Sequence, residues 1–339
     1  MNNTDTLIDF DKELCEGAHN AIHTCLRLRQ DEIITIITDN ECLEIASALV
    51  DEIKKYGAEY KIYILEDYSP RPLKEMPRPI LDGLAKSDVS IFCASAKEGE
   101  LKSRIEMTAV IDRHKIRHGH MVNISKQIMM EGMRADFVVI DELSQRLIEK
   151  ARLAKKITVK SKGGTNLQAE FSTSIKWIKT SGLISVDKWG NLPGGEIFTS
   201  PIDVNGRFVV DGVVGDYLCQ KYGDLKDTPL AIDIKNSRIT HMECKNEQLL
   251  EEFTSYIMTD ENSNRVGEFA IGTNIACTRV IGNILQDEKL PTVHIAFGHP
   301  YSQHTGADWK SSTHIDCVSV KCSIWFDNVM VMDEGKFCI

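Results

Sequence analysis

The chain has 339 residues, of which 42% are hydrophobic and 27% are charged, and its formal net charge is −10 at pH 7. This composition excludes a disordered chain, and the acidic balance excludes nucleic acid as the main partner because a polyanion needs a basic surface. No apolar run is long enough to cross a membrane, and the first residues lack the basic start and apolar stretch of a secretory signal. We therefore expect a globular, cytoplasmic protein of two domains with no membrane partner.

The first 150 residues alternate between strands and helices. The expected strands are 32–38, 60–65, 89–94, 120–124 and 135–140, and the expected helices are 41–55, 79–85, 104–113, 126–133 and 142–155. Strands that alternate with helices predict a parallel sheet covered on both faces. We therefore expect an N-terminal three-layer α/β domain over residues 1–152. No glycine-rich nucleotide-binding motif follows any of its strands, which argues against nucleotide binding.

Short strands separated by glycine-containing turns replace this pattern from about residue 156. The expected strands are 156–161, 167–171, 197–199 and 207–214, and the expected helices are 247–258 and the segment near 276–284. This change predicts a C-terminal α+β domain over residues 153–339. All of the candidate functional residues lie in it.

Two histidines and two acids in this second domain have the pattern of a divalent metal site. His314 and Asp316 lie two residues apart in a strand rich in β-branched residues, so their side chains share one face. His294 and Glu268 are each a polar residue in an otherwise apolar strand, where a buried polar side chain needs a partner. A cation is a partner for all four, because imidazole and carboxylate are ordinary ligands of zinc, cobalt, manganese and iron.

Several short motifs in this region resemble the M29 family of metallo-aminopeptidases and occur in that family's order. They are Asn191-Leu192-Pro193-Gly194-Gly195-Glu196-Ile197-Phe198-Thr199-Ser200-Pro201, Gly267-Glu268-Phe269, His294-Ile295-Ala296-Phe297-Gly298 with Tyr301, His314-Ile315-Asp316, and Gly335-Lys336-Phe337. The resemblance spans residues 191–337, and the first domain matches only in general architecture.

The resemblance implies a hydrolase that removes N-terminal residues from short peptides and forms a homodimer. It implies two divalent ions, zinc, cobalt, manganese or magnesium, that activate a water molecule. The implied ligands are Glu196, Glu268, His294, His314 and Asp316. The implied general base is Glu288, and Tyr301 would stabilise the oxyanion.

Two features leave alternatives open. In the full-length peptidases the basic glutamate precedes the histidine by five residues, whereas Glu288 precedes His294 by six, so Asp287 is a second candidate for the base. The chain is also short, and it resembles the 2,5-dihydroxypyridine dioxygenases, short relatives that use one ferrous ion. Their iron ligands would match His294, His314 and Asp316. A third hypothesis is a non-catalytic binding protein that contains a metal.

Overall fold

The computed structural model describes residues 7–187 and 189–339. The chain forms two compact units. Unit 1 consists of Met1–Val138 and Gly182–Gly194, and unit 2 consists of Val139–Ser181 and Gly195–Ile339. These units are defined by contacts, and the domain boundary expected between residues 152 and 153 stays a prediction.

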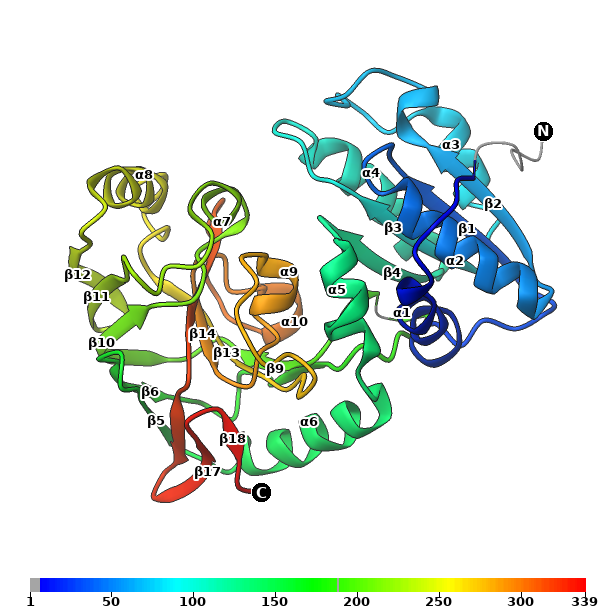
Figure 1. The fold of residues 1–339 in the computed structure, drawn as a ribbon. Helices are drawn as coiled ribbons and strands as arrows, with labels where there is room; N and C mark the ends of the chain where they lie inside the picture. The colour runs from blue at the N-terminus through cyan, green and yellow to red at the C-terminus, as the bar shows by residue number, and fades with distance from the viewer. Residues whose placement is uncertain (1–6, 188) are drawn as a thin grey trace. The chain divides into compact units, whose positions relative to one another are not determined.

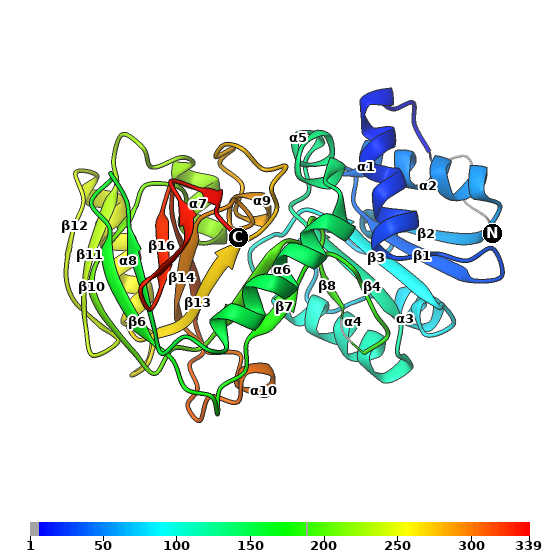
Figure 2. The same ribbon diagram turned by 90° about the horizontal axis from the view of Figure 1, so that it is seen from below.

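Unit 1 is built around a parallel sheet with the strand order β2-β1-β3-β4-β8. Helices cover both faces of this sheet, with α1 and α2 on one face and α3 and α4 on the other (Figure 2). The three-layer α/β arrangement predicted for this region is therefore confirmed. The strands are β1 (Ile33–Thr38), β2 (Glu59–Ile64), β3 (Val89–Ala94), β4 (Arg117–Val122) and β8 (Gly190–Asn191), and the helices are α1 (Cys15–His19), α2 (Leu43–Tyr56), α3 (Arg78–Leu84), α4 (Leu101–His114) and α5 (Lys126–Met130).

Unit 2 contains two sheets and is α+β, as predicted (Figure 1). The larger sheet has the order β12-β11-β10-β6-β5-β16-β17-β18, formed by β12 (Arg238–Glu243), β11 (Leu230–Lys235), β10 (Asp203–Val210), β6 (Asn166–Glu170), β5 (Lys156–Lys160), β16 (Ser323–Phe326), β17 (Val329–Asp333) and β18 (Lys336–Phe337). The smaller sheet, which we call the site sheet, has the order β15-β14-β13-β9-β7, formed by β15 (His314–Ser319), β14 (Val293–Gly298), β13 (Val266–Gly272), β9 (Glu196–Thr199) and β7 (Ile178–Thr180).

Five helices accompany these sheets. They are α6 (Phe137–Ala151), which starts at the end of the first segment of unit 1, and α7 (Asp216–Tyr222), α8 (Glu247–Ile257), α9 (Ile284–Asp287) and α10 (Ser302–Thr305). Among the described residues, no helix combines the length and the apolar character that crossing a bilayer requires.

The hydrophobic core of unit 2 draws side chains from both of its sheets and from two helices. Phe208 of β10, Phe269 of β13 and Ile295 of β14 are fully buried in it, together with Leu147 of α6 and Phe253 of α8. Full burial of one such side chain stabilises the fold by about 1.5–3 kcal/mol. Along β13 and β14 these large apolar residues alternate with Glu268, His294 and small residues, so one face of the site sheet packs in the core and the other carries the polar groups.

Two of the expected elements are wrong. Residues 135–140 were expected to be a strand, but Phe137–Ile140 form the beginning of α6. Phe137 and Ile140 are buried whereas Val138 and Val139 are exposed, which is the spacing of a helix. The segment 276–284 was expected to be helical, but it consists of bends with Gly282 at a φ of +76°, and only the short helix α9 begins at Ile284.

Candidate metal centre

Four of the candidate ligands lie on one face of the site sheet because of the strand register. Asp316 of β15 is opposite Ala296 of β14, and Ala296 is opposite Glu268 of β13. Residues that are directly opposite in a sheet share a face, and so do residues two positions apart on one strand. His294 and His314 therefore lie on this same face, which confirms that His314 and Asp316 point to one side.

The fifth candidate, Glu196, joins this face from β9. Phe198 is opposite Ala270 of β13, and Glu196 is opposite Gly272 two residues along. Ala270, Ala296 and Gly272 are the residues that lie between the polar ones on this face, and their small size leaves room above the sheet for the longer side chains. The sheet thus carries a polar site on a floor of small residues.

A β-bulge at Gly267 sets the direction of Glu268. The pairing of β13 with β14 shifts between Val266 and Glu268, so that Gly267 is the extra residue. A side chain could not replace it without movement, because a Cβ atom at Gly267 would lie 2.3 Å from the carbonyl oxygen of Gly298. The glycine before Glu268 in the sequence motif is therefore required by close backbone contact.

The distances between these side chains match those of ligands around one ion. Two donor atoms that are each about 2.1 Å from a tetrahedral ion are about 3.4 Å apart, longer than an N–H···O hydrogen bond of about 2.9 Å. His294 Nε2 lies 3.5 Å from both Glu196 Oε2 and Glu268 Oε1. His314 Nε2 lies 3.3 Å from Asp316 Oδ1 and 3.9 Å from Glu268 Oε2. The distances of 3.3–3.5 Å, together with the imidazole and carboxylate donors, therefore suit a divalent cation.

Hydrogen bonds to the backbone orient one of the two imidazoles. His314 Nδ1 lies 2.9 Å from the carbonyl oxygen of His299, so Nδ1 carries a hydrogen and Nε2 faces the carboxylates. His294 is almost fully buried, and its Nδ1 has no hydrogen-bond partner within the described part of the chain. Its Nε2 likewise faces the carboxylates.

The electrostatics of the cluster also favour a cation. Burial opposes protonation of His294, but Glu268, Glu196 and Asp316 outweigh it and raise the pKa of this imidazole to about 9. Burial is likewise outweighed at His314, where Asp316 and Glu268 raise the pKa to about 10. Protons on the imidazoles thus balance the carboxylates, and a divalent ion can replace those protons.

The two candidates for the general base have different surroundings. Asp287 is buried, and its carboxylate accepts hydrogen bonds from the backbone N–H groups of Ile281, Gly282 and Asn283, so it fixes that loop. Glu288 instead lies with His294 and Asp316, with ligand atoms all within 4.8 Å of one another. Burial raises the pKa of Glu288 to about 8. Of the two, Glu288 is the acid brought to the cluster.

Sequence reasoning missed Lys289. Its side chain is 1% exposed, and its Nζ lies 2.7 Å from Glu196 Oε1 and 2.5 Å from Glu288 Oε1. A buried ammonium group needs such partners because burial of an unpaired charge is unfavourable. The signal was available, since Lys289 stands five residues before His294, where the resemblance places the glutamate.

Tyr301 also belongs to this site. Its ring centroid lies 4.7 Å from that of His314, and its backbone is left-handed with φ 49° at the start of α10. Burial, reinforced by the charge of Glu268, raises the pKa of the Tyr301 hydroxyl well above its usual value. The hydroxyl therefore stays protonated and can donate a hydrogen bond.

A second group of metal-binding residue types occurs in unit 1 and has a simpler explanation. His19 Nδ1 and His23 Nε2 lie 2.8 and 2.9 Å from the same oxygen of Glu52, and His19 is exposed. These are hydrogen-bond distances, shorter than the separation of ligands around an ion. The group is therefore explained as two histidines bonded to one carboxylate.

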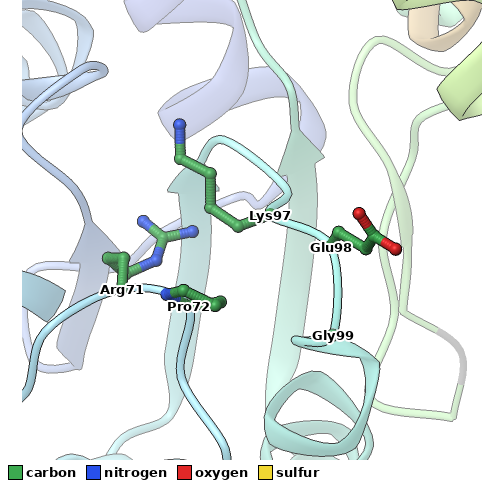
Figure 3. A pocket seen from close by; sticks show the side chains of 5 residues that line it. All are labelled: Arg71, Pro72, Lys97, Glu98 and Gly99. Atoms are coloured by element: carbon green, nitrogen blue, oxygen red, sulfur yellow. The ribbon is translucent and has the colours of Figure 1, made fainter.

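A surface hollow in unit 1 is lined by Arg71, Pro72, Lys97, Glu98 and Gly99 (Figure 3). The side chain of Arg71 is 7% exposed, and its guanidinium bonds to Asp39, to Glu100 and to the carbonyl oxygen of Ser95. These bonds occupy all of its nitrogens, so the hollow offers no free cation from Arg71 to a ligand. The site sheet remains the better candidate.

Comparison with solved structures supports this fold. The chain matches the 2,5-dihydroxypyridine dioxygenase of Pseudomonas putida KT2440 with a TM-score of 0.67 and 14% identity, over 96% of each chain. It matches wild-type AmpT of Thermus thermophilus with a TM-score of 0.72 and 15% identity, over 97% of this chain and 99% of that one. At such identities the likeness shows the fold alone. A comparison with curated protein sequences gives no match.

A family model described as thermophilic metalloprotease (M29) matches residues 141–336, which is more than half of the chain and includes every candidate ligand. The chain therefore belongs to the M29 family of metalloproteases.

Proposed function

We propose that this protein is a metal-dependent aminopeptidase that removes the N-terminal residue from short peptides. One observation carries the proposal: five residues of the matched segment converge on one face of the site sheet at the separations of metal ligands. These residues are Glu196, Glu268, His294, His314 and Asp316. Membership of a metalloprotease family supports the same chemistry.

The residues around the ligands have separate roles in this proposal. A divalent ion supplies Lewis acidity, which polarises the peptide carbonyl and lowers the pKa of water. Glu288 accepts the proton of the attacking water, because it is the acid beside the cluster that the family resemblance does not assign as a ligand. Tyr301 donates a hydrogen bond to the developing oxyanion. In this proposal, Glu196 or the ion receives the free amino group of the substrate.

The test measures release of the first residue from a short peptide and from its N-acetylated form. We expect turnover of the free peptide only, loss of activity with a chelator, and recovery on addition of zinc, cobalt, manganese or magnesium. Asp316→Ala should lower kcat/KM by at least 1,000-fold, because the variant lacks a charged ligand of the ion. This factor corresponds to about 4 kcal/mol, the size of the loss when a group that stabilises charge in the transition state is removed. Full activity of this variant would refute the site. Lys179→Met is the control variant. It removes a charge that pairs with Asp141 elsewhere in unit 2, and it should keep its activity.

A second function is favoured by one specific observation. Lys289 is paired with Glu196. The candidate ligands that form no ion pair with this lysine include His294, His314 and Asp316, which are the two-histidine, one-carboxylate set of ferrous oxygenases. The fold is also that of the Pseudomonas putida dioxygenase. Oxygen uptake with 2,5-dihydroxypyridine after anaerobic loading with ferrous iron, without peptide hydrolysis under any metal, would establish this alternative. Metal binding with neither activity would indicate a non-catalytic binding protein.

A further inference from the structure

Both the backbone and the side chain of Lys289 are held at the candidate metal centre, the backbone by hydrogen bonds and the ammonium group by ion pairs. Lys289 N donates to the carbonyl oxygen of Gln286 at 2.8 Å, and its own carbonyl oxygen accepts from Asn274 N at 3.0 Å. Gly272 of β13 lets this segment approach the sheet, since a Cβ atom there would lie 2.7 Å from the carbonyl carbon of Lys289. These contacts fix the backbone of Lys289, and the ion pairs with Glu196 and Glu288 hold its ammonium group.

The carboxylates that Lys289 contacts are committed to it. Oε1 of Glu196 accepts hydrogen bonds both from Lys289 Nζ at 2.7 Å and from Thr180 Oγ1 at 2.8 Å. Oε1 of Glu288 lies 2.5 Å from the same Nζ. An ion bound between these two glutamates would lie beside a fixed positive charge, and the repulsion is strong in a buried site. By contrast, within the described part of the chain no ion pair joins Lys289 to Glu268 or Asp316.

The charges of the cluster are compatible with one divalent ion. Glu196 and Glu288 are both paired with Lys289, which leaves Glu268 and Asp316 as the two carboxylates that balance the charge of one ion. Buried charges are stable when they are closely balanced.

We propose that Lys289 takes the place of a second metal ion, so that this chain binds one divalent ion, through Glu268, His294, His314 and Asp316. Glu196 and Glu288 are then held by the ammonium group. The inference rests on the proposed function only in taking this cluster as the metal centre, and it replaces the two ions implied by the resemblance with one ion and one lysine.

The experiment counts the ions bound per chain by calorimetric titration and by elemental analysis, with Zn²⁺ and with Co²⁺ as probes. All proteins carry His19→Ala and His23→Ala, so that the group of His19, His23 and Glu52 in unit 1 does not contribute. Lys289→Met removes the charge and keeps the length of the side chain. Lys289→Arg keeps the charge, and Lys179→Met is a matched control because Lys179 also pairs with a carboxylate in unit 2. Lys289→Gln replaces Lys289→Met if that variant does not fold.

We expect one ion in the parent protein, in Lys289→Arg and in Lys179→Met, and two ions in Lys289→Met. Two ions in the parent protein would overturn the inference and leave the proposed function intact. One ion in both the parent and Lys289→Met would overturn it as well, because the lysine would not be what excludes the second ion. No bound ion in any of them would refute the metal centre itself, and with it the proposed function.

Discussion

The imidazoles of His294 and His314 carry protons that an arriving metal ion has to displace. Their pKa values of about 9 and about 10 lie above the ordinary value of 6.5, because nearby carboxylates outweigh the effect of burial. In the metal-free protein these imidazolium pairs stabilise the fold fully below pH 6.5, and that stabilisation is lost as the pH rises through 9 and 10. Metal binding needs the neutral rings, so its dependence on pH has the opposite sign.

We therefore expect the affinity for Zn²⁺ to rise with pH between 6 and 9, and binding at pH 7 to release about two protons, one from each imidazole. Calorimetric titration in two buffers with different enthalpies of ionisation measures the number released. Equal binding enthalpies in the two buffers would contradict the prediction. His294→Ala should release fewer protons than the parent protein, because one of the two rings is absent.

The difference between what the sequence revealed and what it did not is clear at these residues. His314 and Asp316 could be proposed because strand periodicity shows that they share a face, and Glu268 and His294 because each is a polar residue in an otherwise apolar strand. Their role as ligands stays a prediction. Lys289 could not be found from such patterns, because a lysine is ordinarily exposed; its spacing to His294 was the one available signal, and three-dimensional contacts show that it is buried between two glutamates.

At the scale of the elements, the bulge in β13 sets the direction of the Glu268 side chain. We expect Gly267→Ala to destabilise the protein by about 1–3 kcal/mol, because the added carbon would press on the carbonyl oxygen of Gly298 and the strand would have to shift. Metal affinity should fall as well, since Glu268 moves with the strand. Chemical denaturation and metal titration measure the two effects. Gly190→Ala is the control, because its Cβ would meet only the flexible end of the Ile184 side chain; an equal loss of metal affinity there would contradict this account.

The elements that sequence reasoning misjudged were decided by competing local signals. Residues 135–140 are rich in β-branched and aromatic types, which favour a strand, yet Phe137, Ile140 and Leu147 are buried at helical spacing and continue into the later part of α6. In 276–284, the turn at Gly282 and the three backbone hydrogen bonds to Asp287 replace a helix. The strands β3 and β5 were predicted within one residue because each is a short apolar or alternating run bounded by turn residues.

At the scale of the molecule, metal binding should stabilise one unit and leave the other unchanged. All candidate ligands are in unit 2, and a ligand at 100 times its Kd stabilises the state that binds it by about 2.7 kcal/mol. We expect amide hydrogen exchange in β13, β14 and β15 to slow on addition of Zn²⁺, while β1 and β3 of unit 1 serve as the internal control. Asp316→Ala should abolish the effect. Equal slowing in both units would show that the ion acts elsewhere.

The path of the chain between β7 and β9 has a consequence for how the protein can be made. These two strands are neighbours in the site sheet, yet Gly182–Gly194 between them belongs to unit 1 and supplies β8, which pairs with β4. Neither unit is therefore encoded by one uninterrupted stretch. A fragment that ends at residue 152 lacks the fifth strand of its sheet, and during synthesis unit 1 can be completed only after residue 194 has left the ribosome. Glu196 follows two residues later. The first candidate ligand therefore emerges just as β8 becomes able to pair with β4 and complete the parallel sheet.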